Sequence, residues 1–214
     1  SAEEIAWIQT SYLIAEVIMI PMSGFLARAL STRVFFSICA GGFTLASALC
    51  ATATTIDQMI VYRAFQGFIG GGMIPIAFAA AFTVFPREKQ AMVTALVGLT
   101  VTLAPTIGPT VGGYLTELFS WHWLFLVNVI PGILATVICW TLVDFDRPEP
   151  GLLGRFDFVG LLFMALFLGS LEYVVEEGQK NDWFQDRGIT LFATVSVVFC
   201  VLFFCRTLTI KTPI

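Results

Sequence analysis

Two ionisable side chains lie inside long apolar runs of the sequence, where a membrane protein could move a proton or hold a cation. Glu16 lies close to the middle of the run over residues 5–27. A charge at the centre of a bilayer costs about 2.5–3.5 kcal/mol on insertion scales, so such residues usually face a cavity or are kept protonated. Two interpretations stay open: a structural acid held by a neighbouring hydroxyl or amide, or a site that takes up a proton or attracts a cation.

Glu16 shares one face of its predicted helix with other polar or polarisable side chains. Gln9, Tyr12, Glu16, Met19 and Ser23 follow steps of 3, 4, 3 and 4 residues. Side chains at this spacing stack on the same side of an α-helix. We expect this face to look into the helix bundle or a water-filled path, with Tyr12 and Met19 lining the cavity.

Arg63 is the second charge inside an apolar run, here the run over residues 58–85. Arg63, Gln66 and Gly67 share one helical face, and we expect Gln66 to line the same cavity. A guanidinium stays charged under essentially all conditions, so Arg63 needs an anionic or carbonyl partner. Arg63 either forms a structural pair with Asp57 or with backbone carbonyls, or it tunes the protonation of a nearby acid.

A stripe of prolines and glycines marks the predicted helix over residues 91–116. Its members are Pro105, Gly108, Pro109, Gly112 and Gly113. Two prolines one turn apart remove two hydrogen bonds of the helix and bend it. Glycines at the same spacing let another backbone approach closely. The stripe therefore predicts a bent, smooth surface that can rock against a neighbouring helix.

The elements that must position these residues are membrane-spanning helices. The chain is 57% hydrophobic and only 12% charged, whereas roughly a quarter of the residues in soluble domains are charged. A spanning helix needs about 20 largely apolar residues. Seven candidate spans meet this need, at about 5–27, 34–54, 58–85, 91–116, 123–143, 157–177 and 189–209. The sequence lacks the ten-residue alternation of barrel strands, so an all-α membrane bundle is predicted.

The basic residues alternate between the two sides of these spans and orient the chain. Arg28, Arg33, Arg87, Lys89, Arg147, Arg155, Arg206 and Lys211 fall on one side, and Lys180 and Arg187 on the other. Cytoplasmic loops carry the excess of basic residues. We therefore expect loops 28–33, 86–90 and 144–156 to be cytoplasmic, and the first helix to run from outside to inside.

Other chemistries find little support in the sequence. The five cysteines fall in apolar runs without a CxxC pair, which argues against a metal site. The sole histidine, His122, lies between two tryptophans, where an interfacial aromatic residue is more typical than a catalytic base. No basic patch suited to nucleic acid is present. We predict a protein that is not an enzyme and uses no cofactor other than protons.

Four segments resemble a known family, and they occur in that family's order. They are Arg63-Ala-Phe-Gln66-Gly67 with Gly70-Gly71-Gly72 and Pro75, the run from Pro105 to Gly113, Trp121-His-Trp123 through Pro131-Gly132, and Arg155-Phe-Asp157-Phe-Val-Gly160. On these segments the chain resembles the major facilitator superfamily, and within it the fourteen-helix EmrB/QacA-type drug:proton antiporters of the EmrB subgroup. One loop departs from the family pattern, with Arg28 where an acid is usual and Ser31 where a glycine is usual.

The resemblance implies which part of the family fold is present. The seven spans would be family helices 2–8, with the first helix and the C-terminal half missing. Residues 1–143 would form the N-terminal transmembrane bundle of family helices 2–6, and residues 144–156 a cytoplasmic loop. Residues 157–214 would form the extra helix pair, family helices 7–8, that links the two halves.

The resemblance also implies a function, namely proton-coupled efflux of hydrophobic or cationic drugs across the bacterial inner membrane by alternating access. Glu16 and Arg63 would couple protons, Tyr12, Met19 and Gln66 would contact substrate, and the stripe from Pro105 to Gly113 would be the antiporter motif. A periplasmic adaptor (a membrane fusion protein) and an outer-membrane channel are the implied partners.

Two alternatives stay open for the function. A metabolite exporter or another transporter could share the same fold, although the proline and glycine stripe argues against an importer. A non-transporting membrane scaffold subunit belongs to another class. Transport of substrate driven by a pH gradient separates a transporter from a scaffold.

Overall fold

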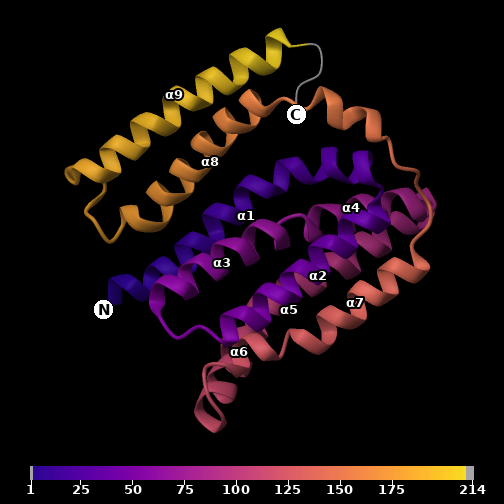
Figure 1. Cartoon of the computed structure of the whole chain (residues 1–214), viewed down its shortest axis with the longest axis horizontal. Helices are drawn as coiled ribbons and strands as arrows, with labels where there is room; N and C mark the ends of the chain where they lie inside the picture. The colour runs from indigo at the N-terminus through magenta and orange to yellow at the C-terminus, as the bar shows by residue number, and fades with distance from the viewer. Residues whose placement is uncertain (1, 211–214) are drawn as a thin grey trace.

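The protein is a bundle of seven membrane-spanning helices, seen in a computed structural model that describes residues 2–210 (Figure 1). The elements are α1 (Ala2–Leu30), α2 (Thr32–Ala51), α3 (Ile56–Gly70), α4 (Met73–Val84), α5 (Arg87–Leu118), α6 (Trp123–Leu126), α7 (Val129–Leu142), η1 (Pro150–Arg155), α8 (Phe158–Gly178), η2 (Trp183–Gln185) and α9 (Arg187–Thr209). No strand occurs within residues 2–210. The predicted all-helical class and the seven spans are confirmed. Lys211, counted above for the orientation, lies outside the described residues.

Two of the spans are broken, whereas the sequence predicted continuous helices. The third span consists of α3 and α4, separated at Gly71 and Gly72. Glycine is a poor helix former, because it loses more backbone freedom than any other residue on folding. The fifth span consists of α6 and α7, separated near Asn128, whose amide donates to Ser47 Oγ at 3.3 Å and to the Leu124 carbonyl at 3.4 Å. Such side-chain hydrogen bonds compete with those of the helix.

Helix α1 lies between α3 on one side and α8 on the other, with α9 beyond α8 (Figure 1). Helix α2 packs against α3 and α7, while α5 touches mainly α4 and α6. The main apolar core joins α1, α2, α4 and α8. Its buried members are Met19, Met22, Phe35, Cys39, Ile76 and Met164.

Two glycines of the third span let α1 approach very closely. A Cβ atom added at Gly67 would collide with the carbonyl oxygen of Tyr12, and one at Gly71 would lie 2.6 Å from the carbonyl oxygen of Glu16. Contact this close requires glycine, as in the small-residue interfaces of other membrane helices. The glycines therefore hold the backbone of α1, at the level of Tyr12 and Glu16, against the helix that carries Arg63.

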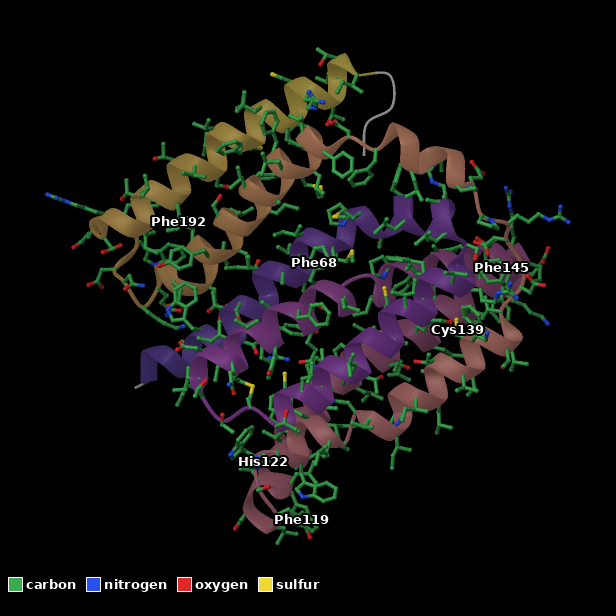
Figure 2. All side chains as sticks on the ribbon, in the orientation of Figure 1. Phe68, Phe119, His122, Cys139, Phe145 and Phe192 are labelled. Carbon is green, nitrogen blue, oxygen red and sulfur yellow. The ribbon has the colours of Figure 1, made fainter. Side chains whose placement is uncertain are left out.

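At the end of the bundle predicted to be cytoplasmic, the segment after α7 is tied to the turn between α1 and α2. Asp146 Oδ2 accepts hydrogen bonds from the backbone N and from Oγ1 of Thr32, both at 2.7 Å. Arg33 and Asp144 form an exposed ion pair at 3.8 Å. Two loops that the charge pattern assigned to one side thus lie together, with Phe145 at this end and His122 at the opposite one (Figure 2).

Ser31, in the same turn, has a backbone conformation that suits glycine. Its φ is 78° and its ψ is 151°, a region that is essentially restricted to glycine and that costs other residues of order 1–3 kcal/mol. This is the position where the related family usually has glycine. The Ser31 hydroxyl compensates in part by accepting from Val34 N at 3.4 Å, as a helix cap.

We expect Ser31→Gly to stabilise the protein by about 1 kcal/mol, because relief of the backbone strain outweighs the few tenths lost when a serine cap becomes glycine. Thermal unfolding of the purified protein in detergent checks this. Ser31→Ala keeps the strain and loses the cap, so it should be less stable than the parent. A Ser31→Gly variant that unfolds at a lower temperature than the parent would show that the backbone of Ser31 is not strained.

The α8–α9 hairpin is closed at the same end by a bidentate ion pair. Arg206 Nε donates to both oxygens of Asp157 at 2.9 Å, and Nη2 donates to Oδ1 at 2.6 Å. Asp157 also caps α8 by accepting from Gly160 N at 2.9 Å. The hydrogen bonds from Arg206 lower the pKa of Asp157 below its usual range. The pair therefore stabilises the hairpin at neutral pH.

Asp157→Asn should lower the melting temperature by several degrees at pH 7, because the amide keeps the helix cap but cannot balance the charge of Arg206. The pKa of Asp157 is lower in the folded state. Its contribution is therefore complete above the unfolded pKa of about 3.9 and is lost as the pH falls through the folded value. The difference in melting temperature between parent and variant should be constant from neutral pH to mildly acidic pH, and it should disappear only below that range. Asp144→Asn, in the exposed pair with Arg33, is the matched control and should change little.

Candidate functional site

Arg63 lies at the centre of a polar cluster between α1 and α3. Its Nη1 donates to Gln66 Oε1 at 2.7 Å, and its Nη2 donates to Gln9 Oε1 at 3.4 Å. The guanidinium carbon is 4.0 Å from the centre of the Tyr12 ring, which is a close cation–π contact. The partner is therefore not Asp57, which the sequence left open. Amide oxygens and an aromatic face take the place of an acid.

Glu16 joins this cluster through Tyr12. The Tyr12 hydroxyl donates to Glu16 Oε1 at 3.5 Å, the long end of the hydrogen-bond range. Arg63 and Glu16 form no direct ion pair among the described residues, and the Tyr12 ring lies between the two charges. The carboxylate is therefore held by a hydroxyl, as one interpretation of the sequence had it, yet a proton or a cation could still bind to it.

The helical spacing and the glycine contact explain why these residues meet. Tyr12 and Glu16 are one turn apart on α1, and Arg63 and Gln66 are one turn apart on α3. The close approach at Gly67 brings the two faces together. Of the residues predicted to contact substrate, Tyr12 and Gln66 are in the cluster, where Gln66 is 1% exposed.

Met19 has a different environment. It is buried in the main apolar core, next to Phe35 and Ile76. Its Cβ lies near Gly71, one turn further along the interface between α1 and the third span. A role for Met19 in contact with substrate stays a prediction.

Two residues of the cluster were not found by sequence reasoning. Cys50 Sγ donates to Gln66 Oε1 at 3.8 Å, and the Phe125 ring is 6.0 Å from the Arg63 guanidinium. Both lie in apolar runs on other spans, where nothing in their spacing distinguishes them from packing residues. Only the packing of α2 against both α3 and α6 brings them to the site.

A cavity of about 530 Å³ lies toward the outer end of the bundle, around the turn between α2 and α3. Its lining is mostly apolar and includes Ile8, Met59, Trp121 and Phe125. Phe125 thus contributes to both the cavity and the surroundings of Arg63. A volume of this size and an apolar lining are typical of sites for drug-sized molecules.

The proline and glycine stripe lies mainly in a part of α5 that is exposed on every side, because each residue from 101 to 111 is exposed. Pro105, Gly108, Pro109 and Gly113 are exposed, and no atom lies within 4 Å of a Cβ added at Gly108 or Gly113. At Gly112 the nearest atom would be Leu124 Cδ2, at 3.3 Å. Within the described residues the stripe therefore meets a neighbouring helix, α6, at Gly112, and its role as a moving contact stays a prediction.

Comparison with known proteins identifies relatives of the chain. It is 45% identical over its whole length to the colistin resistance protein EmrB of Acinetobacter baumannii, of which it covers 42%. It is 33% identical over 92% of its length to the probable multidrug resistance protein EmrY of Escherichia coli, covering 38% of that protein. It is 31% identical over 97% of its length to the multidrug export protein EmrB of Escherichia coli, covering 40%.

The chain spans about two fifths of the length of these relatives. A family model matches residues 1–212, and its description is Major Facilitator Superfamily. The match includes all seven spans. The chain therefore belongs to the Major Facilitator Superfamily, as an EmrB-type multi-pass protein of the inner membrane.

Proposed function

We propose that the intact protein exports hydrophobic or cationic compounds across the inner membrane in exchange for protons. The observation that carries the proposal is the cluster of Glu16, Tyr12 and Arg63 inside the membrane-spanning region. An apolar cavity of about 530 Å³ lies toward the outer end of the bundle and meets the surroundings of Arg63 at Phe125. Relatives named as multidrug export and resistance proteins support the same function. We infer alternating access and proton coupling from the resemblance to the drug:proton antiporters of the family.

The cluster suggests how a proton and a substrate could compete. When Glu16 releases its proton, a negative charge remains inside the membrane-spanning region and attracts a cationic substrate. The fixed positive charge of Arg63, which lies over the Tyr12 ring, weakens the attraction that the negative charge exerts on a cation. Tyr12 contacts both charged groups and so links them. Proton uptake by Glu16 from the outer side then favours substrate release. Each ligand shifts the equilibrium between conformations only by its differential affinity for them.

We further propose how the chain is divided into functional parts and which proteins it works with in export. Residues 1–143 act as the N-terminal bundle, 144–156 as a cytoplasmic loop, and 157–214 as the helix pair that links two halves of the transporter. Protons are the coupling ion, and no other cofactor is needed. A periplasmic adaptor and an outer-membrane channel complete the export path in bacteria with two membranes.

Transport by the intact protein in proteoliposomes tests the proposal. An imposed pH gradient should drive a fluorescent lipophilic cation against its concentration gradient, and the cation should in turn move protons. Collapse of the gradient with a protonophore should stop the transport. A protein that binds the cation but never moves it in response to the gradient is a scaffold or a different transporter, and the proposal is then wrong.

A further inference from the structure

A second acid, which the proposed transport cycle does not use, is buried on the other side of α1. Glu177 is 9% exposed as a whole residue, and its side chain is 12% exposed. It lies in the last turn of α8. Thr10 Oγ1 of α1 donates to Glu177 Oε1 at 2.9 Å and shares its proton with the Ala6 carbonyl oxygen at 3.1 Å. Lys180 Nζ lies 3.0 Å from the same Glu177 oxygen. Thr10 itself is fully buried.

This contact is directional, while the rest of the α1–α8 interface is mainly apolar. Trp7 stacks on Tyr173 with ring centres 5.7 Å apart, and a Cβ added at Gly169 would touch Ile14 at 3.4 Å. Apolar contacts of this kind do not depend strongly on angle, so they allow a helix to turn or slide. A hydrogen bond weakens steeply when its geometry changes, so the bond between Thr10 and Glu177 fixes α1 more tightly.

Thr10 is well placed to control the orientation of the polar cluster. It follows Gln9 directly and lies two residues before Tyr12, so it points about 200° away from Tyr12 around the helix. Helix α8 therefore holds the back of α1 while the Arg63 side of α3 faces its front. A turn of α1 about its axis would break the bond to Glu177 and carry Tyr12 away from Arg63 at the same time.

We propose that Glu177 is a positioning residue that fixes the rotation of α1, so that the face with Gln9, Tyr12 and Glu16 meets Arg63. The α8–α9 pair then has a role beyond linking two halves of a transporter, because it serves as a strut for the helix that carries the candidate proton site. The positioning itself is a matter of structure, and only its consequence for transport rests on the proposed function.

The rotation of α1 can be measured without transport. Ser11 Oγ donates to the Ile60 carbonyl of α3 at 3.3 Å, so the two backbones are close together. The pair Ser11→Cys with Ile60→Cys should therefore be within reach of a short bifunctional thiol reagent in the intact protein. The native cysteines are replaced beforehand. We expect Glu177→Leu and Thr10→Val each to slow this cross-linking by roughly threefold or more, because residues in contact are energetically coupled and loss of the bond frees α1 to turn. Glu177→Gln, whose amide oxygen still accepts from Thr10, should restore most of the rate.

Transport then reports the consequence for the site. Glu177→Leu should raise the KM for a lipophilic cation by about fivefold or more with a smaller change in kcat per folded molecule, which indicates altered binding. A purely structural role would lower the amount of folded protein and leave KM unchanged. The matched control is Glu176→Leu, one position away on the same helix, for which we expect neither the cross-linking rate nor KM to change.

The two measurements separate the possible outcomes. Cross-linking at the parent rate in both Glu177→Leu and Thr10→Val overturns the proposal, even if transport falls. Slower cross-linking in a protein whose parent form shows no proton-driven transport supports the positioning role and contradicts the proposed function. If Glu177→Leu does not fold, Thr10→Val, which keeps the pair of Glu177 with Lys180, decides the question.

Discussion

Replacing Glu16 with glutamine in the intact protein should reduce efflux driven by a pH gradient by at least about tenfold, equivalent to roughly 1.4 kcal/mol in an activation barrier. Glutamine has nearly the same shape and can still accept a hydrogen bond from Tyr12. It cannot take up or release a proton, and it carries no charge to attract a cation. The loss should therefore come from coupling, and the melting temperature should stay close to that of the parent.

Two further variants show whether the charge of Glu16 or its surroundings carry the effect. Glu16→Asp keeps the proton but draws the carboxylate back from Tyr12, so partial activity is expected. Glu88→Gln is the control, because Glu88 lies in an exposed first turn of α5 outside the apolar core of its span. Uptake assays in proteoliposomes at several imposed pH gradients give the measurement. If Glu16→Gln transports as fast as the parent, the structural interpretation of Glu16 is correct.

The candidate site shows how far sequence reasoning reaches in a membrane protein. Long apolar runs predict spans because the bilayer allows few alternatives, and helical spacing predicts which residues of one span share a face. That reasoning brought together Tyr12 with Glu16, and separately Arg63 with Gln66. The meeting of the two pairs depends on contact between spans far apart in the sequence. No periodicity within one span contains that information.

The partner of Arg63 illustrates the limit. The sequence pointed to Asp57 or backbone carbonyls as structural partners, or to a nearby acid whose protonation Arg63 would tune, because an acid or a carbonyl is the usual partner of a guanidinium in a membrane. The structure instead places the amides of Gln9 and Gln66 and the ring of Tyr12 around it. Three weaker contacts replace one strong pair, and only the packing of α1 on α3 makes them available together.

The contact between Glu177 and Thr10 had no signal in the sequence at all. Glu177 is near the end of its span, where an exposed interfacial acid is the ordinary expectation. Its burial arises because α8 packs against α1, a pairing of helices separated by more than a hundred residues along the chain. Long-range pairs of this kind are a property of the fold, and a single sequence does not reveal them.

Gly67→Ala is the stability change for which we expect the largest effect. The added Cβ would overlap the carbonyl oxygen of Tyr12, and a backbone atom cannot move aside as a side chain can. Helices α1 and α3 would have to separate, at a cost of about 1–3 kcal/mol or more, typical of overpacking in a tight core. The contact of Arg63 with Tyr12 would lengthen as well, so substrate transport should fall together with the melting temperature.

The control for Gly67→Ala uses the same substitution in a helix that lacks the close contact. No atom lies within 4 Å of a Cβ added at Gly98, in the middle of α5. Alanine is the better helix former by about 1 kcal/mol, so Gly98→Ala should be neutral or slightly stabilising. The difference in melting temperature between the two variants therefore isolates the helix contact from helix propensity. Equal melting temperatures would show that α1 and α3 are less closely packed at Gly67 than the contact with Tyr12 requires.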